Sequence, residues 1–175
     1  VDDLLRLSKI SRGHDLKLEQ VDLGSLVART IRRMRADYPR AMIKASALPG
    51  ATCDAGLMQH VFDNLIENAL KYSAKKEAPQ VEIGMQTAEG ERIFFVRDNG
   101  AGFDMAHAPT LFGVFRRFHS ESEFPGTGVG LAIVKRIIER HRGRVWAQSV
   151  SGEGTTFFFT LGDPAEIMEP APASP

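Results

Sequence analysis

The segment that follows Asp54 constrains the fold of this 175-residue chain more than any other. Apolar residues recur in it every three or four positions, the spacing that places side chains on one face of an α-helix. Asp54 itself is a good N-cap residue. The predicted buried stripe consists of Leu57, Val61, Phe62, Leu65, Ile66, Ala69 and Leu70. We therefore expect a well-packed helix that lies against another layer of the fold.

The other segments predict two further helices and a set of strands that can form the second layer. Asp22 is a candidate N-cap for a helix that ends before Pro39, and a further helix is predicted from Gly130 to Arg140. Strands are predicted over residues 42–45, 80–86, 93–97, 144–149 and 155–161, with a turn at Glu89-Gly90. Helices and antiparallel strands in this order favour a two-layer α/β sandwich, with a mixed, mostly antiparallel sheet and the helices on one face.

The composition excludes several classes of protein. Lys plus Arg and Asp plus Glu balance at 22 each, which argues against a DNA-binding protein. No apolar run approaches the length of a membrane span, and no signal peptide opens the chain. Cys53 is the single cysteine, so no internal disulfide can form. We expect a small buried residue there, in a cytoplasmic protein.

The ends of the chain predict a fragment of a longer protein. The chain starts without Met, and residues 1–20 have the pattern of the last turns of a helix followed by a linker. Residues 21–162 are expected to form the folded domain. Residues 163–175, rich in Pro and Ala, have too little to bury and are expected to be disordered.

A first candidate motif lies in the helix after Asp54. Asn64, Asn68 and Lys71 occupy positions i, i+4 and i+7, so they share one helix face. Amide oxygens can bind Mg2+ and an ammonium can meet phosphate oxygens. A solvated polar face has the same pattern, and the motif alone does not separate the two.

A second motif, Asp98-Asn99-Gly100-Ala101-Gly102, follows a predicted strand. A carboxylate at a strand end can accept a hydrogen bond from an exocyclic amine such as that of adenine. Gly100 and Gly102 allow unusual backbone angles and the close approach of a flat ring. The alternative is a simple hairpin turn, because Asp-Asn-Gly is common turn chemistry.

Two glycine-rich motifs follow. Residues 126–131 open a predicted helix, where backbone N–H groups can hold phosphates. This is neither a P-loop, because no Gly-Lys-Ser/Thr follows, nor a dinucleotide-binding turn, because no strand leads into it. Residues 152–157 enter the last strand and mean little alone. The aperiodic stretch of residues 98–128 has the length of a functional loop, such as a lid.

In this order, the four motifs resemble the N, G1, G2 and G3 boxes of the GHKL ATP-binding superfamily. Residues 112–118 resemble the F box of sensor histidine kinases, and residues 118–125 resemble the phytochrome- and PAS-linked kinases in particular. The resemblance covers residues 21–161. It implies the Bergerat-type α/β sandwich with a long ATP lid. It also implies a catalytic domain that transfers the γ-phosphoryl group of Mg·ATP to a histidine on a dimerisation domain absent from this chain.

The same resemblance implies roles for individual residues. Asp98 would bind the adenine amine, and Thr155 would support the base through its hydroxyl or a water. Arg117 would steady charge on the γ-phosphate during transfer, with Lys71 also at the phosphates. The other predicted nucleotide contacts are Asn64, Asn68, Tyr72, Gly100, Gly102, Gly126, Thr127, Gly128, Val129, Gly130 and Leu131.

Position 64 bears on the type of reaction. Asn68, with Asn64, would hold Mg2+ across the phosphates. Hydrolysing relatives carry Glu at position 64 to activate water, and Asn64 cannot act as a general base, so transfer is favoured over hydrolysis. Glu67 faces about 100° away on the helix and is expected to be structural. An ATP hydrolase and an inactive nucleotide-binding regulatory module are the alternatives.

The implied partners are the dimerisation helices of the same kinase, which would be a homodimer at full length, and a response regulator. His14 lacks the pattern of an acceptor histidine. The remaining histidines have no metal-site spacing and are expected at the surface or in the lid; they are His60, His107, His119 and His141. The cluster from Arg29 to Arg40 predicts a solvated or docking surface, or a site for a regulatory anion such as a cyclic dinucleotide.

Overall fold

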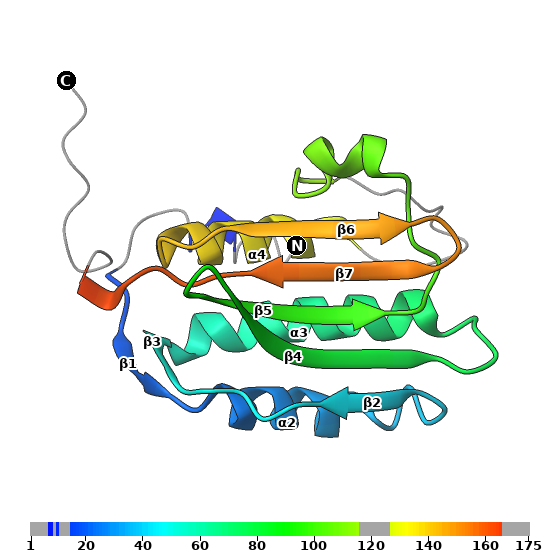
Figure 1. Ribbon diagram of the computed structural model, residues 1–175, viewed down its shortest axis with the longest axis horizontal. Helices are drawn as coiled ribbons and strands as arrows, with labels where there is room; N and C mark the ends of the chain where they lie inside the picture. The colour runs from blue at the N-terminus through cyan, green and yellow to red at the C-terminus, as the bar shows by residue number, and fades with distance from the viewer. Residues whose placement is uncertain (1–6, 9, 11–14, 116–126, 166–175) are drawn as a thin grey trace.

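The helices begin where the N-cap signals predict them. Asp22 starts α2 (Leu23–Met34) and Asp54 starts α3 (Ala55–Ser73), each by accepting a backbone N–H from three residues further on, at 3.2 and 3.0 Å. The third helix, α4 (Gly130–Arg140), has the predicted bounds. The computed structural model describes residues 7–8, 10, 15–115 and 127–165 (Figure 1).

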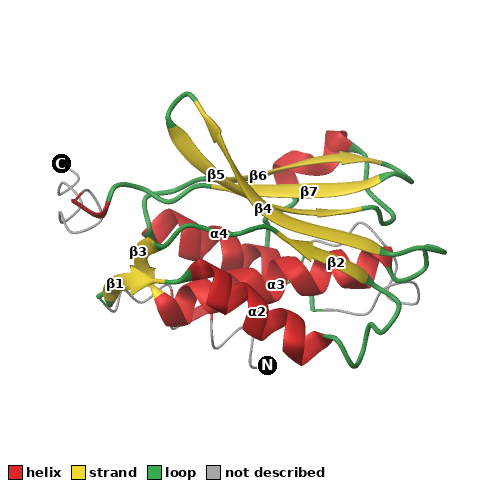
Figure 2. Cartoon of the chain, turned by 60° about the horizontal axis from the view of Figure 1, so that its bottom comes forward, coloured by secondary structure: helices red, strands yellow, loops and turns green. Residues whose placement is uncertain are grey.

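Five strands form the main sheet, in the order β2-β4-β5-β7-β6. They are β2 (Met42–Ala45), β4 (Gln80–Ala88), β5 (Glu91–Asp98), β6 (Val145–Val150) and β7 (Gly154–Phe159). β2 runs parallel to β4, and the other three pairs are antiparallel. Figure 2 shows the three helices on one face of this sheet. The predicted two-layer α/β sandwich with a mixed, mostly antiparallel sheet is therefore confirmed.

A second, two-stranded sheet was not predicted from the sequence pattern. β1 (Leu18–Val21) pairs antiparallel with β3 (Ala51–Asp54). The Gln20 side chain donates to the Thr52 hydroxyl at 2.6 Å across the pair. Cys53 is fully buried in β3, as expected. Burial, followed by the charges of Asp54 and Glu19, raises the pKa of its thiol to about 11, so the thiol is protonated and unreactive.

The core lies between the sheet and the central helix α3, which contacts both other helices and strands β4, β5 and β7. Phe159 is fully buried there. Its ring meets Phe62 edge-on at 5.9 Å and stacks on Phe94 at 5.2 Å. Leu57, which was predicted in the buried stripe of α3, is only partly buried. No helix in the described part of the chain is long and apolar enough to cross a membrane.

The long segment after β5 is less irregular than the sequence indicates. It contains a short 3-10 helix, η1 (Met105–Thr110), which Asp104 starts by accepting from the Ala106 N–H at 2.9 Å. Further on, the Phe115 N–H donates to the Gly128 carbonyl at 2.9 Å. This bond joins the two described ends of the predicted lid.

His141 contradicts the prediction of a surface or lid position, because it is fully buried at the end of α4. Its Nε2 accepts the Asp54 N–H at 3.1 Å, so Nδ1 carries the proton and donates to the Ile137 carbonyl at 2.8 Å. Burial lowers the pKa of the ring. A neutral imidazole can satisfy one amide and one carbonyl at once, and this is why it is tolerated inside.

Candidate functional site

Asp98 lies at the carboxyl end of β5, beside the first residues of β7, at the right-hand end of the sheet in Figure 1. Its side chain is buried, with 6% exposure, and its Oδ1 accepts the Gly100 N–H at 2.8 Å. Burial raises the pKa of the carboxyl to about 6, although the Gly100 and Thr155 backbone and the charge of Lys76 lower it. A desolvated carboxylate without a charged contact partner is a strong acceptor for a ligand's amine.

Gly100 and Gly102 hold this loop against neighbouring segments. A Cβ on Gly100 would lie 2.5 Å from the Tyr72 carbonyl oxygen, and one on Gly102 (φ 60°) would lie 2.0 Å from the Val150 carbonyl oxygen. The Ala101 N–H donates to the same Tyr72 carbonyl at 3.1 Å. Both glycines therefore allow close backbone packing, and their predicted role beside a flat ring stays a prediction.

Thr155 stands directly opposite Asp98 in the β5–β7 pair. Its hydroxyl lies 2.9 Å from the Ser149 hydroxyl, which donates its own proton to the Gly154 carbonyl at 2.9 Å and accepts the Phe103 N–H at 2.9 Å. Because Ser149 has one proton, Thr155 must be the donor between the two hydroxyls. Its lone pairs are then left to accept. Ser149 was missed from the sequence, which shows only a polar residue within a strand.

The start of α4 meets the polar face of α3. A Cβ on Gly130 would lie 2.4 Å from Asn64 Oδ1. The Asn64 amide donates to the His60 carbonyl at 2.8 Å, so its oxygen faces the glycine-rich segment. Among the described residues, no side chain caps α4, whose N-cap residue is Val129, and Gly128 has φ 70°. Backbone N–H groups at such a helix start can bind an anion.

Three more predicted residues continue along α3. Asn68 is half-buried and, within the described ranges, its side chain has no hydrogen-bond partner. The Lys71 ammonium lies 4.6 Å from the centre of the Tyr72 ring. A half-buried amide without a protein partner is available to a ligand. Asn64, Asn68 and Lys71 therefore present a polar strip between the Asp98 loop and the start of α4.

The structure does not place every predicted site residue. Arg117 and Gly126 lie outside the described residues, as do His14 and His119. Thr127 is exposed next to the start of α4, and Leu131 is partly buried in its first turn. Among the described residues, no cluster of three His, Cys, Asp or Glu side chains could hold a metal ion.

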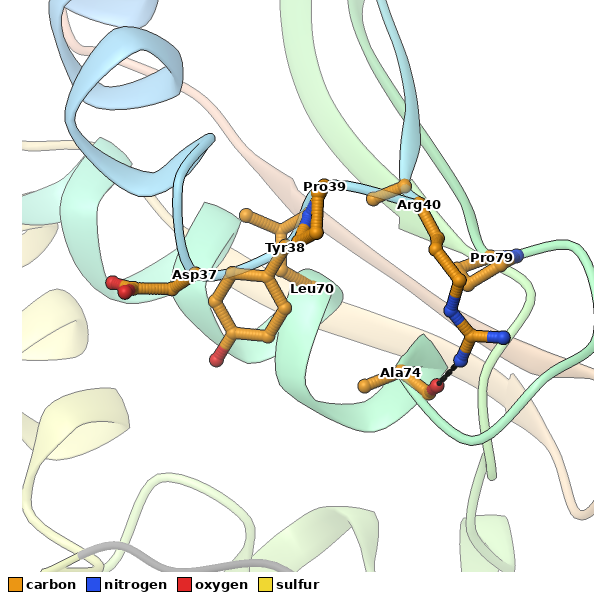
Figure 3. Close-up of a pocket in the computed structure, with 8 residues that line it drawn as sticks. Asp37, Tyr38, Pro39, Arg40, Leu70, Ala74 and Pro79 are labelled. Atoms are coloured by element: carbon orange, nitrogen blue, oxygen red, sulfur yellow. Dashed lines mark hydrogen bonds between the residues drawn. The ribbon is translucent and has the colours of Figure 1, made fainter.

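A separate pocket lies at the carboxyl end of α3, between the loop after α2 and the loop before β4 (Figure 3). The Arg40 guanidinium donates to the Ala74 carbonyl at 3.2 Å at its edge. None of its lining residues is a predicted ATP contact, although Arg40 belongs to the predicted arginine cluster. They are Asp37, Tyr38, Pro39, Arg40, Ala41, Leu70, Ala74 and Pro79.

Residues 53–165, well over half of the chain, match the family of histidine kinase-, DNA gyrase B- and HSP90-like ATPases. The chain belongs to this family. The match spans the buried Asp98 loop, the polar strip of α3 and the glycine-rich start of α4 of this histidine kinase-like ATPase domain.

The curated relatives of this ATPase domain include a cyanobacterial phytochrome and a sensor protein kinase. It is 41% identical over 162 residues to cyanobacterial phytochrome A of Nostoc sp., covering 92% of this chain and 21% of that protein. It is 34% identical to the sensor protein kinase WalK of Staphylococcus epidermidis, covering 97% of this chain and 28% of WalK. The chain thus spans less than a third of these curated relatives.

A solved structure has a similar fold. A structure of full-length ShkA in complex with AMPPNP superimposes with a TM-score of 0.77 at 25% identity, covering 91% of this chain and 34% of ShkA. The resemblance to the GHKL superfamily, drawn from the four motifs, and to phytochrome-linked sensor histidine kinases, drawn from residues 112–125, is therefore confirmed as a family relationship.

Proposed function

We propose that this domain binds Mg·ATP and that its γ-phosphoryl group is passed to a histidine on a separate segment of the same kinase. The observation that carries the proposal is the convergence of motifs that are far apart in the sequence. Asp98 lies against Thr155, the following loop packs on Tyr72, and Asn64 touches Gly130. Four weak sequence signals thus form one surface.

The base end of this surface suits adenine. The Gly100 N–H donates to Asp98 Oδ1 at 2.8 Å, and the remaining lone pairs of the carboxylate can accept the exocyclic amine. The Thr155 hydroxyl donates its hydrogen bond to the Ser149 hydroxyl. Its lone pairs can therefore accept a hydrogen bond from the base or from a water. A guanine base presents a carbonyl where adenine has its amine, and the carboxylate would repel it.

The phosphate end suits a metal–triphosphate. Asn68 and Asn64 supply amide oxygens, the ligand type that Mg2+ prefers, and Mg2+ would neutralise charge on the phosphates when bound. The first turn of α4 adds backbone N–H donors for the triphosphate. Lys71 supplies a cation beside the Tyr72 ring. Arg117 completes this set as the predicted catalytic cation.

Asn64 favours transfer over hydrolysis, because an amide cannot take a proton from water. The carboxylate nearby, Glu67, is exposed. Its charge acts on Tyr38, where burial and then Glu67 raise the pKa of the phenol. Glu67 therefore faces the loop after α2, away from the polar strip, as its helix position indicates.

The partners of the intact kinase belong to the same proposal. They are its dimerisation helices, in a homodimer, and a response regulator, all within the cytoplasm. The cyclic dinucleotide stays a prediction without support. Two of the five arginines in the cluster from Arg29 to Arg40 have partners within the domain: Arg33 pairs with Asp63 at 2.7 Å, and Arg40 donates to the Ala74 carbonyl.

Calorimetric titration with a non-hydrolysable ATP analogue tests the binding step. We expect micromolar affinity, about −8 kcal/mol, that is lost in Asp98→Ala and becomes independent of Mg2+ in Asn68→Ala. Asp104→Ala, an exposed carboxylate on the same loop, is the matched control. Absence of binding by the wild-type chain would refute the proposal.

Adding the dimerisation helices with ATP labelled at the γ-phosphate then tests transfer. Acid-labile label on those helices would support a histidine kinase. Release of inorganic phosphate without labelled helices would instead support the hydrolase.

A further inference from the structure

Lys76 lies outside all four motifs, in the loop that joins α3 to β4. Its ammonium donates to the Gly152 carbonyl at 2.6 Å, across 76 positions of sequence. Gly152 belongs to the turn between β6 and β7, at the same end of the sheet as Asp98. The bond therefore ties the end of the helix layer to the sheet beside the base-binding end of the proposed site.

Three other hydrogen bonds show that the segments around Asp98 are bound to one another. The Gly152 N–H donates to the Ala101 carbonyl at 2.6 Å. The Asn99 side chain donates to the Ala78 carbonyl at 2.9 Å and accepts the Gln80 N–H at 2.9 Å. The segment after Asp98 thus holds both the turn and the loop, and Lys76 joins these two to each other.

Lys76 also supplies the charge that Asp98 lacks among its contacts. Among the described residues, Lys76 is the charged side chain that lowers the pKa of this buried carboxyl. The backbone groups of Gly100 and Thr155 lower it as well. The neighbouring cation on β5, Arg97, points to the opposite face of the sheet and pairs with Glu82 at 3.3 Å.

Among the described residues, no acidic side chain contributes to the pKa shift of Asp98, although Glu77 follows Lys76 in the loop and Glu153 follows Gly152 in the turn. β6 and β7 contribute the neutral hydroxyls of Ser149 and Thr155. On α3, the Lys71 ammonium lies against the Tyr72 ring, 4.6 Å from its centre. A cation at the rim of a desolvated carboxylate favours its ionised, purely accepting form.

We propose that Lys76 is a positioning residue for the nucleotide base, acting through the Gly152 carbonyl and the Asp98 carboxylate. It holds the turn and the loop together at the edge of the site, and its charge keeps Asp98 an acceptor for the exocyclic amine. The inference rests on the proposed binding of ATP to this surface.

The test compares the wild-type chain with Lys76→Met, Lys76→Arg and Lys75→Met. Lys75 is an exposed neighbour in the same loop, so Lys75→Met removes an equal charge. The affinity for a non-hydrolysable ATP analogue is measured by calorimetry at a series of pH values, and circular dichroism checks folding of each variant.

For Lys76→Met we expect about tenfold weaker binding near neutral pH. We also expect the acidic midpoint at which affinity is lost to rise by about one pH unit. Lys76→Arg should restore the wild-type midpoint, and Lys75→Met should leave affinity and midpoint unchanged.

Three other outcomes are decisive. If Lys76→Met binds like Lys75→Met, the inference is wrong while the proposed function stands. If Lys76→Met lowers affinity equally at every pH, Lys76 has a structural role only, and the inference is again wrong. If the wild-type chain does not bind the analogue, the proposed function itself fails.

Discussion

Replacing Asp98 by Asn should stabilise the fold at neutral pH while it weakens nucleotide binding. Burial raises the pKa of Asp98 from 3.8 to about 6, so the folded state holds this proton more tightly than the unfolded chain. Stability is therefore lost as the pH rises through this interval. Two units of difference correspond to about 3 kcal/mol, the largest gain expected for Asp98→Asn above the folded pKa.

The same substitution at Asp63 should have the opposite sign. Asp63 accepts from Thr30 at 2.6 Å and Gln59 at 2.8 Å, and pairs with Arg33 at 2.7 Å. Burial raises the pKa of Asp63, but these hydrogen bonds outweigh it, and the net shift is downward. Its contribution to stability is present above the ordinary pKa and is lost as the pH falls. Asp63→Asn should cost about 1–3 kcal/mol at neutral pH.

Urea unfolding, followed by the fluorescence of Trp146, measures both variants against the wild-type chain. The Asp98→Asn midpoint should lie above the wild-type midpoint at about pH 7.5 and converge with it near pH 4. The Asp63→Asn midpoint should lie below it at about pH 7.5. The reasoning is refuted if Asp98→Asn is the less stable protein at the higher pH, or if its difference from the wild type does not change with pH.

Three further predictions concern packing and hydrogen bonding. Gly102→Ala should lose about 2–4 kcal/mol of stability, from strain plus a carbonyl clash, whereas Gly90→Ala (φ 80°, open space) should lose about 1 kcal/mol; equal urea midpoints would contradict this. Ser149→Ala should cost about 1–3 kcal/mol of stability. It should also weaken binding of the ATP analogue, because the Thr155 hydroxyl loses the partner that orients it; unchanged affinity in calorimetry would contradict this. His141→Gln should flatten the loss of stability below about pH 6.5, since the ring's folded pKa is lowered and the unfolded chain binds the proton more tightly; a pH series of melting temperatures checks this.

The sequence by itself determined the helices and the kind of chemistry. The bounds of α4 and β2, and the starts of α2 and α3, follow from caps, turns and apolar periodicity, which are properties of residues close together in the chain. The four motifs likewise indicated the family, because each needs only a few adjacent residues and their order is readable along the chain.

β1 and β3 were not predicted from the sequence, although β2, which is equally short, was. The two strands lie far apart in the chain, and each is stable only because it pairs with the other. The sheet order has the same origin, since β7 lies between β5 and β6 through hydrogen bonds to both.

Tertiary structure alone decided which side chains support the site. Lys76 meets Gly152, Ser149 fixes the proton of Thr155, and His141 bridges from α4 to Asp54. Each depends on a neighbour that the sheet or the helix layer brings near. Their burial and charge environment arise from long-range packing, which no local pattern encodes.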